Sequence, residues 1–136
     1  MNKPPPYIRK ERYELHDLLS LVELHHTKAD IVIFDGDPIK LGSDRYKLFK
    51  TKGTVCAECG IVGTFFAKER TFTKKTPKKV SWHMNLYAIA ADGTEVLMTK
   101  DHIYPKSLGG KDELENYQPM CHICNSKKGH KIIPIG

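Results

Sequence analysis

The sequence of 136 residues contains no long apolar run and only four cysteines. No apolar stretch approaches the roughly 20 residues that a membrane-spanning helix needs. The first residues, MNKPPPYIRKERYELHD, lack the apolar stretch of a signal peptide. We therefore expect a cytoplasmic location and no membrane partner. At this length we expect one domain, or one domain with an arm.

All four cysteines stand in two widely separated C-x-x-C pairs: Cys56, Cys59, Cys121 and Cys124. In a reducing compartment such pairs indicate metal ligands or a redox centre rather than disulfide bonds. A redox C-x-x-C pair belongs in a βαβ context, which this sequence lacks. Four thiolates are the ligand set of a closed, structural zinc ion. We therefore predict one structural Zn²⁺ on these residues, with Gly60 providing the positive φ of the first turn.

Basic residues outnumber acidic ones, 22 to 16, which gives a formal net charge of +6. This balance is typical of proteins that bind a polyanion such as nucleic acid. Residues 68–79 concentrate six basic residues against one acidic residue. The segment is either a solvated loop or an arm that contacts phosphates. In the second interpretation the DNA-binding residues are Lys74, Lys75, Lys78 and Lys79.

We expect residues 1–50 to form an N-terminal extension of a helix and short strands. Apolar residues at three- and four-residue spacing predict a helix over residues 9–26. The run DIVIF predicts a strand over residues 30–34, followed by a turn at residues 35–38. A further strand is expected over residues 45–50. Asp35 and Asp37 are interpreted as turn residues, because the other ligands of a calcium loop are missing.

Residues 51–136 are expected to form an α+β domain that contains the cysteine pairs. A strand is predicted over residues 61–67, and a hairpin over residues 81–99 with a two-residue type I′ turn at Asp92-Gly93. A short strand near residues 117–120 and a helix from about residue 122 follow. This order of elements is that of a treble-clef finger: a knuckle, then a hairpin, then a helix that carries the last two ligands.

The last third of the chain carries the chemically distinctive residues. They are, in order, Asp101-His102, Asn116, Cys124-Asn125 and Lys128-Gly129. In this order, beside the cysteine pairs, they resemble the HNH endonuclease family (His-Me finger or ββα-metal nucleases), particularly its small phage and prophage members. Taken singly, each has an ordinary alternative role in a turn, on the surface, in a loop or on a helix. The resemblance rests on their combination.

The resemblance implies a zinc-stabilised, treble-clef-like ββα-metal nuclease domain that hydrolyses DNA to 5′-phosphate and 3′-hydroxyl ends. It implies that His102 is the general base and that Asp101 and Asn125 hold one divalent cation, Mg²⁺ or Mn²⁺. Asn116 is implied to tie down the loop that positions His102. The third motif residue is Asn125 rather than histidine, which favours hard cations.

A further candidate, His83, comes from the hairpin register. A two-residue loop at Asp92-Gly93 pairs residues whose numbers sum to 185, which places His83 opposite His102. Directly opposed side chains share a face of the sheet. His83 is then predicted to assist His102 in catalysis, the alternative being a partly exposed strand histidine. A bulge or a longer loop would break this register.

Two other functions stay open. The same residues could form a zinc-finger module that binds nucleic acid without cutting it, or a subunit that acts only within a larger phage assembly. A single active site cuts one strand per visit, so double-strand cleavage would need a homodimer or a second event. If the protein is encoded by a phage, its location is the host cytoplasm.

Overall fold

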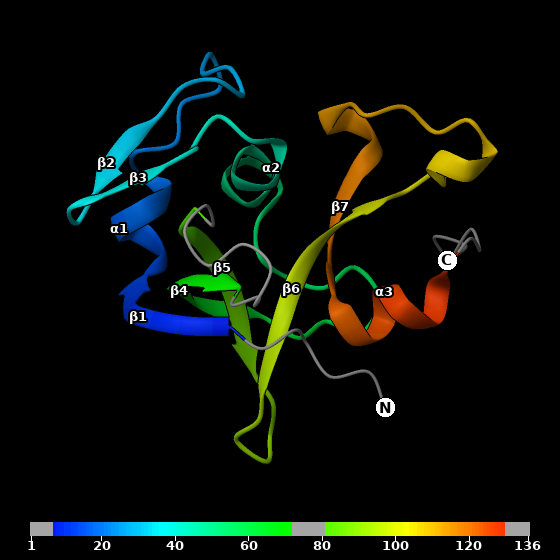
Figure 1. The fold of residues 1–136 in the computed structure, drawn as a ribbon. Helices are drawn as coiled ribbons and strands as arrows, with labels where there is room; N and C mark the ends of the chain where they lie inside the picture. The colour runs from blue at the N-terminus through cyan, green and yellow to red at the C-terminus, as the bar shows by residue number, and fades with distance from the viewer. Residues whose placement is uncertain (1–6, 72–80, 130–136) are drawn as a thin grey trace.

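The computed structural model describes residues 7–71 and 81–129. Its centre is a five-stranded antiparallel sheet with the strand order β1-β4-β5-β6-β7 (Figure 1). These strands are β1 (Tyr7–Glu14), β4 (Gly63–Thr71), β5 (His83–Ile89), β6 (Glu95–His102) and β7 (Tyr117–Cys121). A small hairpin pairs β2 (Val32–Phe34) with β3 (Asp37–Ile39).

The helices are short and less numerous than the strands. They are α1 (Leu15–Leu19), α2 (Asp44–Lys52) and α3 (His122–Lys128), with two 3-10 turns, η1 (Lys106–Leu108) and η2 (Leu114–Asn116). The mixture confirms the expected α+β class. Within the described residues, no helix is both long enough and apolar enough to cross a membrane.

The helix predicted over residues 9–26 is wrong for most of its length. Residues 7–14 form β1, which pairs with β4 and places Tyr13 opposite Phe66. Only Leu15–Leu19 is helical, and Leu18 is its buried residue. The edge of β4 provides backbone hydrogen-bond partners for this segment, and such tertiary pairing overrides helix propensity.

The strand predicted over residues 45–50 is also wrong, because this segment lies in α2. Tyr46 and Leu48 suggest an alternating pattern, but Tyr46 and Phe49 are both buried at helical spacing. Ser43 precedes the helix and Gly53 follows it, as is typical of helix boundaries. The strand predicted over residues 30–34 is confirmed for Val32–Phe34, which form β2.

The hairpin of β5 and β6 exists, but its register differs from the predicted one. Ile89 pairs with Glu95 and Tyr87 with Leu97, so paired numbers sum to 184. The loop is one residue longer than expected, since Ala90 donates its N–H to the carbonyl of Thr94 at 2.8 Å. Gly93 has a φ of 88°, which suits the left-handed position of a three-residue loop.

Beyond Leu97, β6 leaves β5 and pairs with β7, from Met98 opposite Cys121 to His102 opposite Tyr117. Helix α2 provides hydrogen-bond partners to β5 where β6 has left it. The Met84 N–H donates to the Tyr46 hydroxyl at 3.0 Å, and the Met84 carbonyl accepts from Arg45 at 2.9 Å. The helix thus satisfies backbone groups that a longer β6 would have paired.

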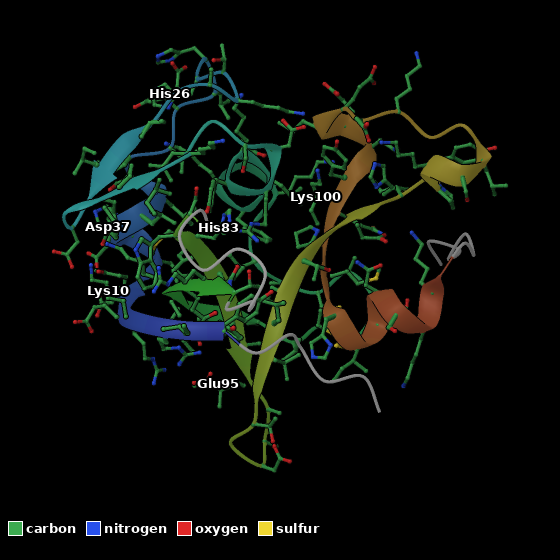
Figure 2. All side chains as sticks on the ribbon, viewed as in Figure 1. Lys10, His26, Asp37, His83, Glu95 and Lys100 are labelled. Atoms are coloured by element: carbon green, nitrogen blue, oxygen red, sulfur yellow. The ribbon has the colours of Figure 1, made fainter. Side chains whose placement is uncertain are left out.

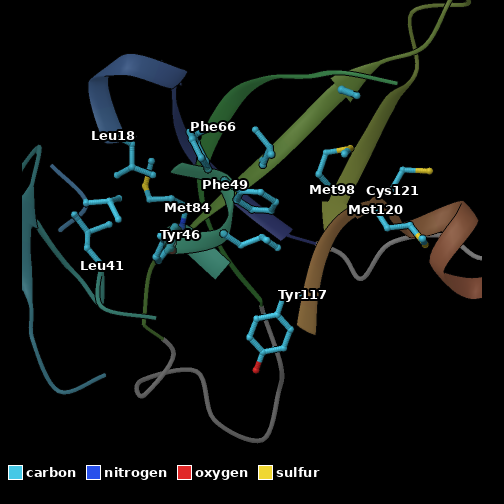
Figure 3. Close-up of a cluster of buried hydrophobic side chains, with 14 of the residues drawn as sticks. Leu18, Leu41, Tyr46, Phe49, Phe66, Met84, Met98, Tyr117, Met120 and Cys121 are labelled. Atoms are coloured by element: carbon cyan, nitrogen blue, oxygen red, sulfur yellow. Dashed lines mark hydrogen bonds between the residues drawn. The ribbon is translucent and has the colours of Figure 1, made fainter. Parts of the chain in front are cut away.

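The main core lies between the sheet and the helices (Figure 3). Leu18 from α1, Phe49 from α2 and Phe66 from β4 are almost fully buried in it, together with Met120 from β7. Residues before and after position 50, the expected domain boundary, therefore share one sheet and one core. Helix α2 itself runs through that boundary.

Candidate active site and metal centre

The cysteine centre is built from a turn and the start of a helix. In the turn before β4, Gly60 donates its N–H to the Cys56 carbonyl at 3.0 Å and has a φ of 79°, as the sequence predicted. At the other end, Cys121 closes β7, and its sulfur accepts from the Cys124 N–H at the start of α3. The two halves are joined directly, because Ala57 donates its N–H to the Pro119 carbonyl at 2.9 Å.

The four cysteine sulfurs all lie within 4.8 Å of one another, and the sulfurs of Cys59 and Cys121 are 3.9 Å apart. A tetrahedral zinc ion with Zn–S bonds of about 2.3 Å places its sulfurs roughly 3.8 Å apart. The cysteine cluster that the sequence predicted is therefore confirmed, and its geometry can hold Zn²⁺. All four thiols are free of disulfide bonds.

The thiol pKa values reflect the backbone around the centre. Burial alone would raise the pKa of the Cys56 thiol. Hydrogen bonds from the backbone N–H groups of Cys59, Cys121 and Glu58 together outweigh this effect, so the pKa is lowered to about 7. Burial raises the pKa values of Cys121 and Cys124, with neighbouring thiols adding to the effect at Cys124. A cation in the centre would oppose that effect, because a metal favours the thiolate.

A second site lies at the far end of β6, in a pocket of about 310 Å³. Asp101 and His102 from β6 line it together with Asn125 from α3, which packs against β6 and β7 (Figure 1). The pocket is completed by Lys100, Pro105, Lys106, Ser107 and Gly129. Three residues singled out in the sequence are thus brought to one cavity by the pairing of β6 with β7 and the packing of α3.

The amide of Asn125 has a defined orientation. Its Nδ2 donates to the Thr99 hydroxyl at 2.9 Å, and that hydroxyl donates its proton to the Met120 carbonyl at 2.7 Å. Because the single hydroxyl proton is used, Thr99 can only accept from Asn125. The amide nitrogen is therefore held towards β6, and the amide oxygen is the atom of Asn125 that can serve as a ligand.

Asp101 is buried, with a relative exposure of 5%, and its carboxylate is held from one side. Its Oδ2 accepts from Gln118 at 2.9 Å and from the ammonium of Lys128 at 2.6 Å. The same ammonium donates to the carbonyl of His102 at 2.5 Å. Lys128 thus fastens the C-terminal end of α3 to the last two residues of β6.

His102 is half-buried between a ring and a carboxylate. Its ring meets that of Tyr117 edge to face, with centroids 5.0 Å apart. Its Nε2 lies 2.7 Å from Oδ1 of Asp112, and the other oxygen of that carboxylate, Oδ2, accepts from Lys106 at 2.9 Å. The hydrogen bond with His102, followed by that with Lys106, lowers the pKa of Asp112 to about 2.

Asn116 holds the loop between β6 and β7. Its side-chain amide exchanges hydrogen bonds with the backbone of Tyr104, at 2.9 and 3.1 Å, and donates to the carbonyl of Lys111 at 2.9 Å. Its own carbonyl accepts from the Ile103 N–H at 2.8 Å. Helix α2 supports the same loop, because Lys52 donates to the Tyr117 carbonyl at 2.7 Å.

The prediction that His83 lies across from His102 is wrong. His83 pairs with Glu69 on β4, and the ladder between β5 and β6 ends at Tyr87 and Leu97. His83 is exposed beside α2 (Figure 2). Although the side chain reaches solvent, the protein packed around the imidazole lowers its pKa, and the positive charges of Arg45 and Lys40 lower it further. The geometric reason for a catalytic role of His83 is therefore lost.

The basic stretch over residues 68–79 does not begin as a loop. Lys68 lies in β4, is fully buried and forms an ion pair with Asp37 at 2.9 Å. Lys74, Lys75, Lys78 and Lys79, the predicted DNA-binding residues, lie outside the described residues.

Sequence reasoning gave no role to several residues that contact the site: Thr99, Lys100, Asp112, Gln118 and Lys128. Alternation along β6 could have placed Thr99 beside Asp101, since residues two apart share a face. In the sequence, Lys128 is distinctive only as part of the Lys128-Gly129 motif. Its contact with Asp101 depends on how α3 packs against β6.

The pocket fits a hard divalent cation in the chemistry of its donors. Asp101 offers a carboxylate and Asn125 an amide oxygen, and Mg²⁺ and Mn²⁺ prefer oxygen ligands. His102 lines the same pocket and adds an imidazole. Lys100 and Lys106 bring positive charge to its wall.

Comparison with known proteins supports a nuclease. A family model described as HNH endonuclease matches residues 91–134, which include Asp101, His102, Asn116 and Asn125. Neither the comparison with curated proteins nor that with solved structures gave a match. The residues that line the pocket therefore all lie within the segment that matches the HNH endonuclease model.

Proposed function

We propose that this protein is a metal-dependent DNA endonuclease whose active site is the pocket at the end of β6. The observation that carries the proposal is that Asp101, His102 and Asn125 meet there, within the segment that matches the HNH endonuclease model. We assign β6, β7 and α3 to a ββα-metal unit, since two paired strands and a helix packed against them surround the pocket. We assign a structural Zn²⁺ to the four cysteines, whose thiolates suit the reducing cytoplasm.

His102 is the general base in this proposal. Its Nε2 donates a proton towards the Asp112 carboxylate, so its Nδ1 has the free lone pair that can accept a proton from water. An imidazole is suited to this task because it titrates near neutral pH. Asn116 holds the backbone of the following loop, and so keeps Asp112 within reach of His102.

Asp101 and Asn125 are the residues that would hold Mg²⁺ or Mn²⁺ through their oxygens. When bound, the ion supplies positive charge that stabilises the phosphate and the departing 3′ oxygen. Lys100 and Lys106 contact the phosphate backbone from the pocket wall. The oxygen of the water deprotonated by His102 forms the new bond to phosphorus. The bond to the 3′ oxygen breaks, and that oxygen takes up a proton from solvent, which leaves 5′-phosphate and 3′-hydroxyl ends.

The test is incubation of plasmid DNA with Mg²⁺, Mn²⁺ or EDTA, followed by separation of supercoiled, nicked and linear forms. We expect nicking that requires the ion and is abolished in His102→Ala. A control, His122→Ala, changes a histidine on α3 that does not line the pocket. DNA that stays intact with every ion but is retarded on a gel would indicate a binding module. Activity that appears only with another protein present would indicate an assembly subunit.

A further inference from the structure

The pocket has an unusual charge balance for a cation site. Among its lining residues, Asp101 is the one carboxylate, while Lys100 and Lys106 are both basic. Asp112, which pairs with His102 and Lys106, is a second acid in contact with the wall. Lys128 adds a third ammonium, directly on Asp101. Three lysines thus face two aspartates.

Lys128 is the most tightly enclosed of these lysines. Its side chain is 1% exposed and that of Asp101 is 6% exposed. Oδ2 of the Asp101 carboxylate accepts hydrogen bonds from both Lys128 and Gln118. Because water screens such a pair poorly, the ammonium cancels much of the negative charge that Asp101 offers to any second cation.

We propose that Lys128 neutralises Asp101 so that the pocket takes up its divalent cation together with a phosphate of the DNA, rather than before it. This inference rests on the proposed nuclease function. With Asp101 neutralised and Asn125 an uncharged ligand, the protein alone attracts the ion weakly. A phosphate supplies the negative charge that is missing, and the lysines on the wall attract that phosphate.

The consequence is a thermodynamic coupling between ion and DNA. The ion binds more tightly when DNA is present, and DNA binds more tightly by the same factor when the ion is present. Lys128 therefore acts as a positioning residue through Asp101. A purely structural role, fastening α3 to β6, would leave ion affinity independent of the charge on residue 128.

The first experiment measures Mn²⁺ binding to zinc-loaded protein without DNA, from the free-ion signal in electron paramagnetic resonance. Lys128→Gln removes the charge but can still donate hydrogen bonds, and Lys128→Arg keeps the charge. We expect Lys128→Gln to bind Mn²⁺ at least about tenfold more tightly than wild type. Lys128→Arg should resemble wild type, as should Lys127→Gln, which removes an exposed charge on the same helix. Adding Asp101→Asn to Lys128→Gln should abolish the gain.

The second experiment needs no change at residue 128. It therefore tests the coupling between the ion and DNA even if Lys128→Gln does not fold. Mn²⁺ binding to His102→Ala is measured with and without a short DNA duplex, which this variant should leave uncut. We expect the duplex to tighten Mn²⁺ binding by at least about tenfold. Equal Mn²⁺ affinity with and without DNA would overturn the proposal, as would a folded Lys128→Gln that binds Mn²⁺ no better than wild type.

Plasmid nicking by wild type, measured in parallel, separates this inference from the proposed function. Ion-dependent nicking combined with unchanged Mn²⁺ affinity in Lys128→Gln would overturn the role of Lys128 and leave the nuclease assignment intact. Absence of both nicking and Mn²⁺ binding, with and without DNA, would overturn both.

Discussion

The Asp112 carboxylate lies 2.7 Å from Nε2 of His102, across the loop that joins β6 to β7. Asp112 is exposed, but hydrogen bonds from His102 and Lys106 lower its pKa to about 2. It therefore remains a carboxylate throughout the pH range in which a histidine titrates. This pair fixes which ring nitrogen of His102 carries a proton.

We expect Asp112→Asn to lower the turnover of DNA cleavage by at least about tenfold, since a general base contributes roughly a hundredfold or more and depends on its tautomer. DNA affinity should change little, because Asp112 does not line the pocket. Single-turnover cleavage rates and gel-shift affinities measure the two effects separately.

The matched control for Asp112 is Glu113→Gln, which removes the charge of the neighbouring exposed acid. Asp112→Glu keeps the charge and should retain more activity than Asp112→Asn. Equal losses of turnover in Asp112→Asn and Glu113→Gln would mean that general loop charge, rather than the pairing with His102, matters.

Thr99 should control the affinity of the pocket for its cation. In Thr99→Val the Asn125 amide loses its acceptor and can turn its nitrogen towards the pocket, whereas Thr99→Ser keeps the hydroxyl. Changes of this kind behind a metal ligand typically cost about 10- to 100-fold in affinity. We expect Thr99→Val to need at least about tenfold more Mn²⁺ for half-maximal cleavage. If Thr99→Val and Thr99→Ser behave alike, the hydroxyl does not orient Asn125.

Metal analysis of the purified protein should find about one tightly held zinc ion per chain. Cys59→Ser should lose that ion and lower the midpoint of thermal unfolding by roughly 10 °C or more, because binding of a structural metal contributes directly to folding. Circular dichroism follows the unfolding. Ala57→Ser in the same turn is the control and should keep the ion. Four freely titratable thiols in the native protein would contradict the assignment.

Lys100 should contribute directly to DNA binding. Its ammonium lies over the ring of Tyr117, 4.2 Å from the centroid, and burial lowers its pKa. We expect Lys100→Met to weaken binding on all DNA sequences alike and to reduce the salt slope by about one. Lys127→Met, on the exposed side of α3, serves as the control. An unchanged salt slope would place Lys100 away from the phosphates.

The basic residues Lys74, Lys75, Lys78 and Lys79 remain predicted DNA contacts. Neutralising all four should weaken binding on every sequence and flatten its salt dependence. A variant with wild-type affinity and salt slope would identify the segment as a solvated surface.

Local chemistry explains why parts of the molecule could be predicted from sequence alone. The two C-x-x-C pairs and Gly60 predicted the cysteine centre, because ligand spacing and a positive φ are properties of a few adjacent residues. Asp92-Gly93 similarly marks a reversal of the chain. The family motif identified the segment that contains Asp101, His102 and Asn125.

Tertiary structure decided the rest. Residues 7–14 became a strand because β4 offered an open edge, and residues 44–52 became a helix that satisfies the backbone of β5. One extra loop residue shifted the hairpin register, and β6 left β5 for β7 beyond Leu97, so His83 does not lie opposite His102. The buried pair of Lys128 and Asp101 joins residues that only the packing of α3 against β6 brings together. Residue types and short spacings therefore determined which side chains could bind a metal or act as a base. Long-range pairing determined the partners of those side chains, because residues distant in sequence form hydrogen bonds only when the chain packs.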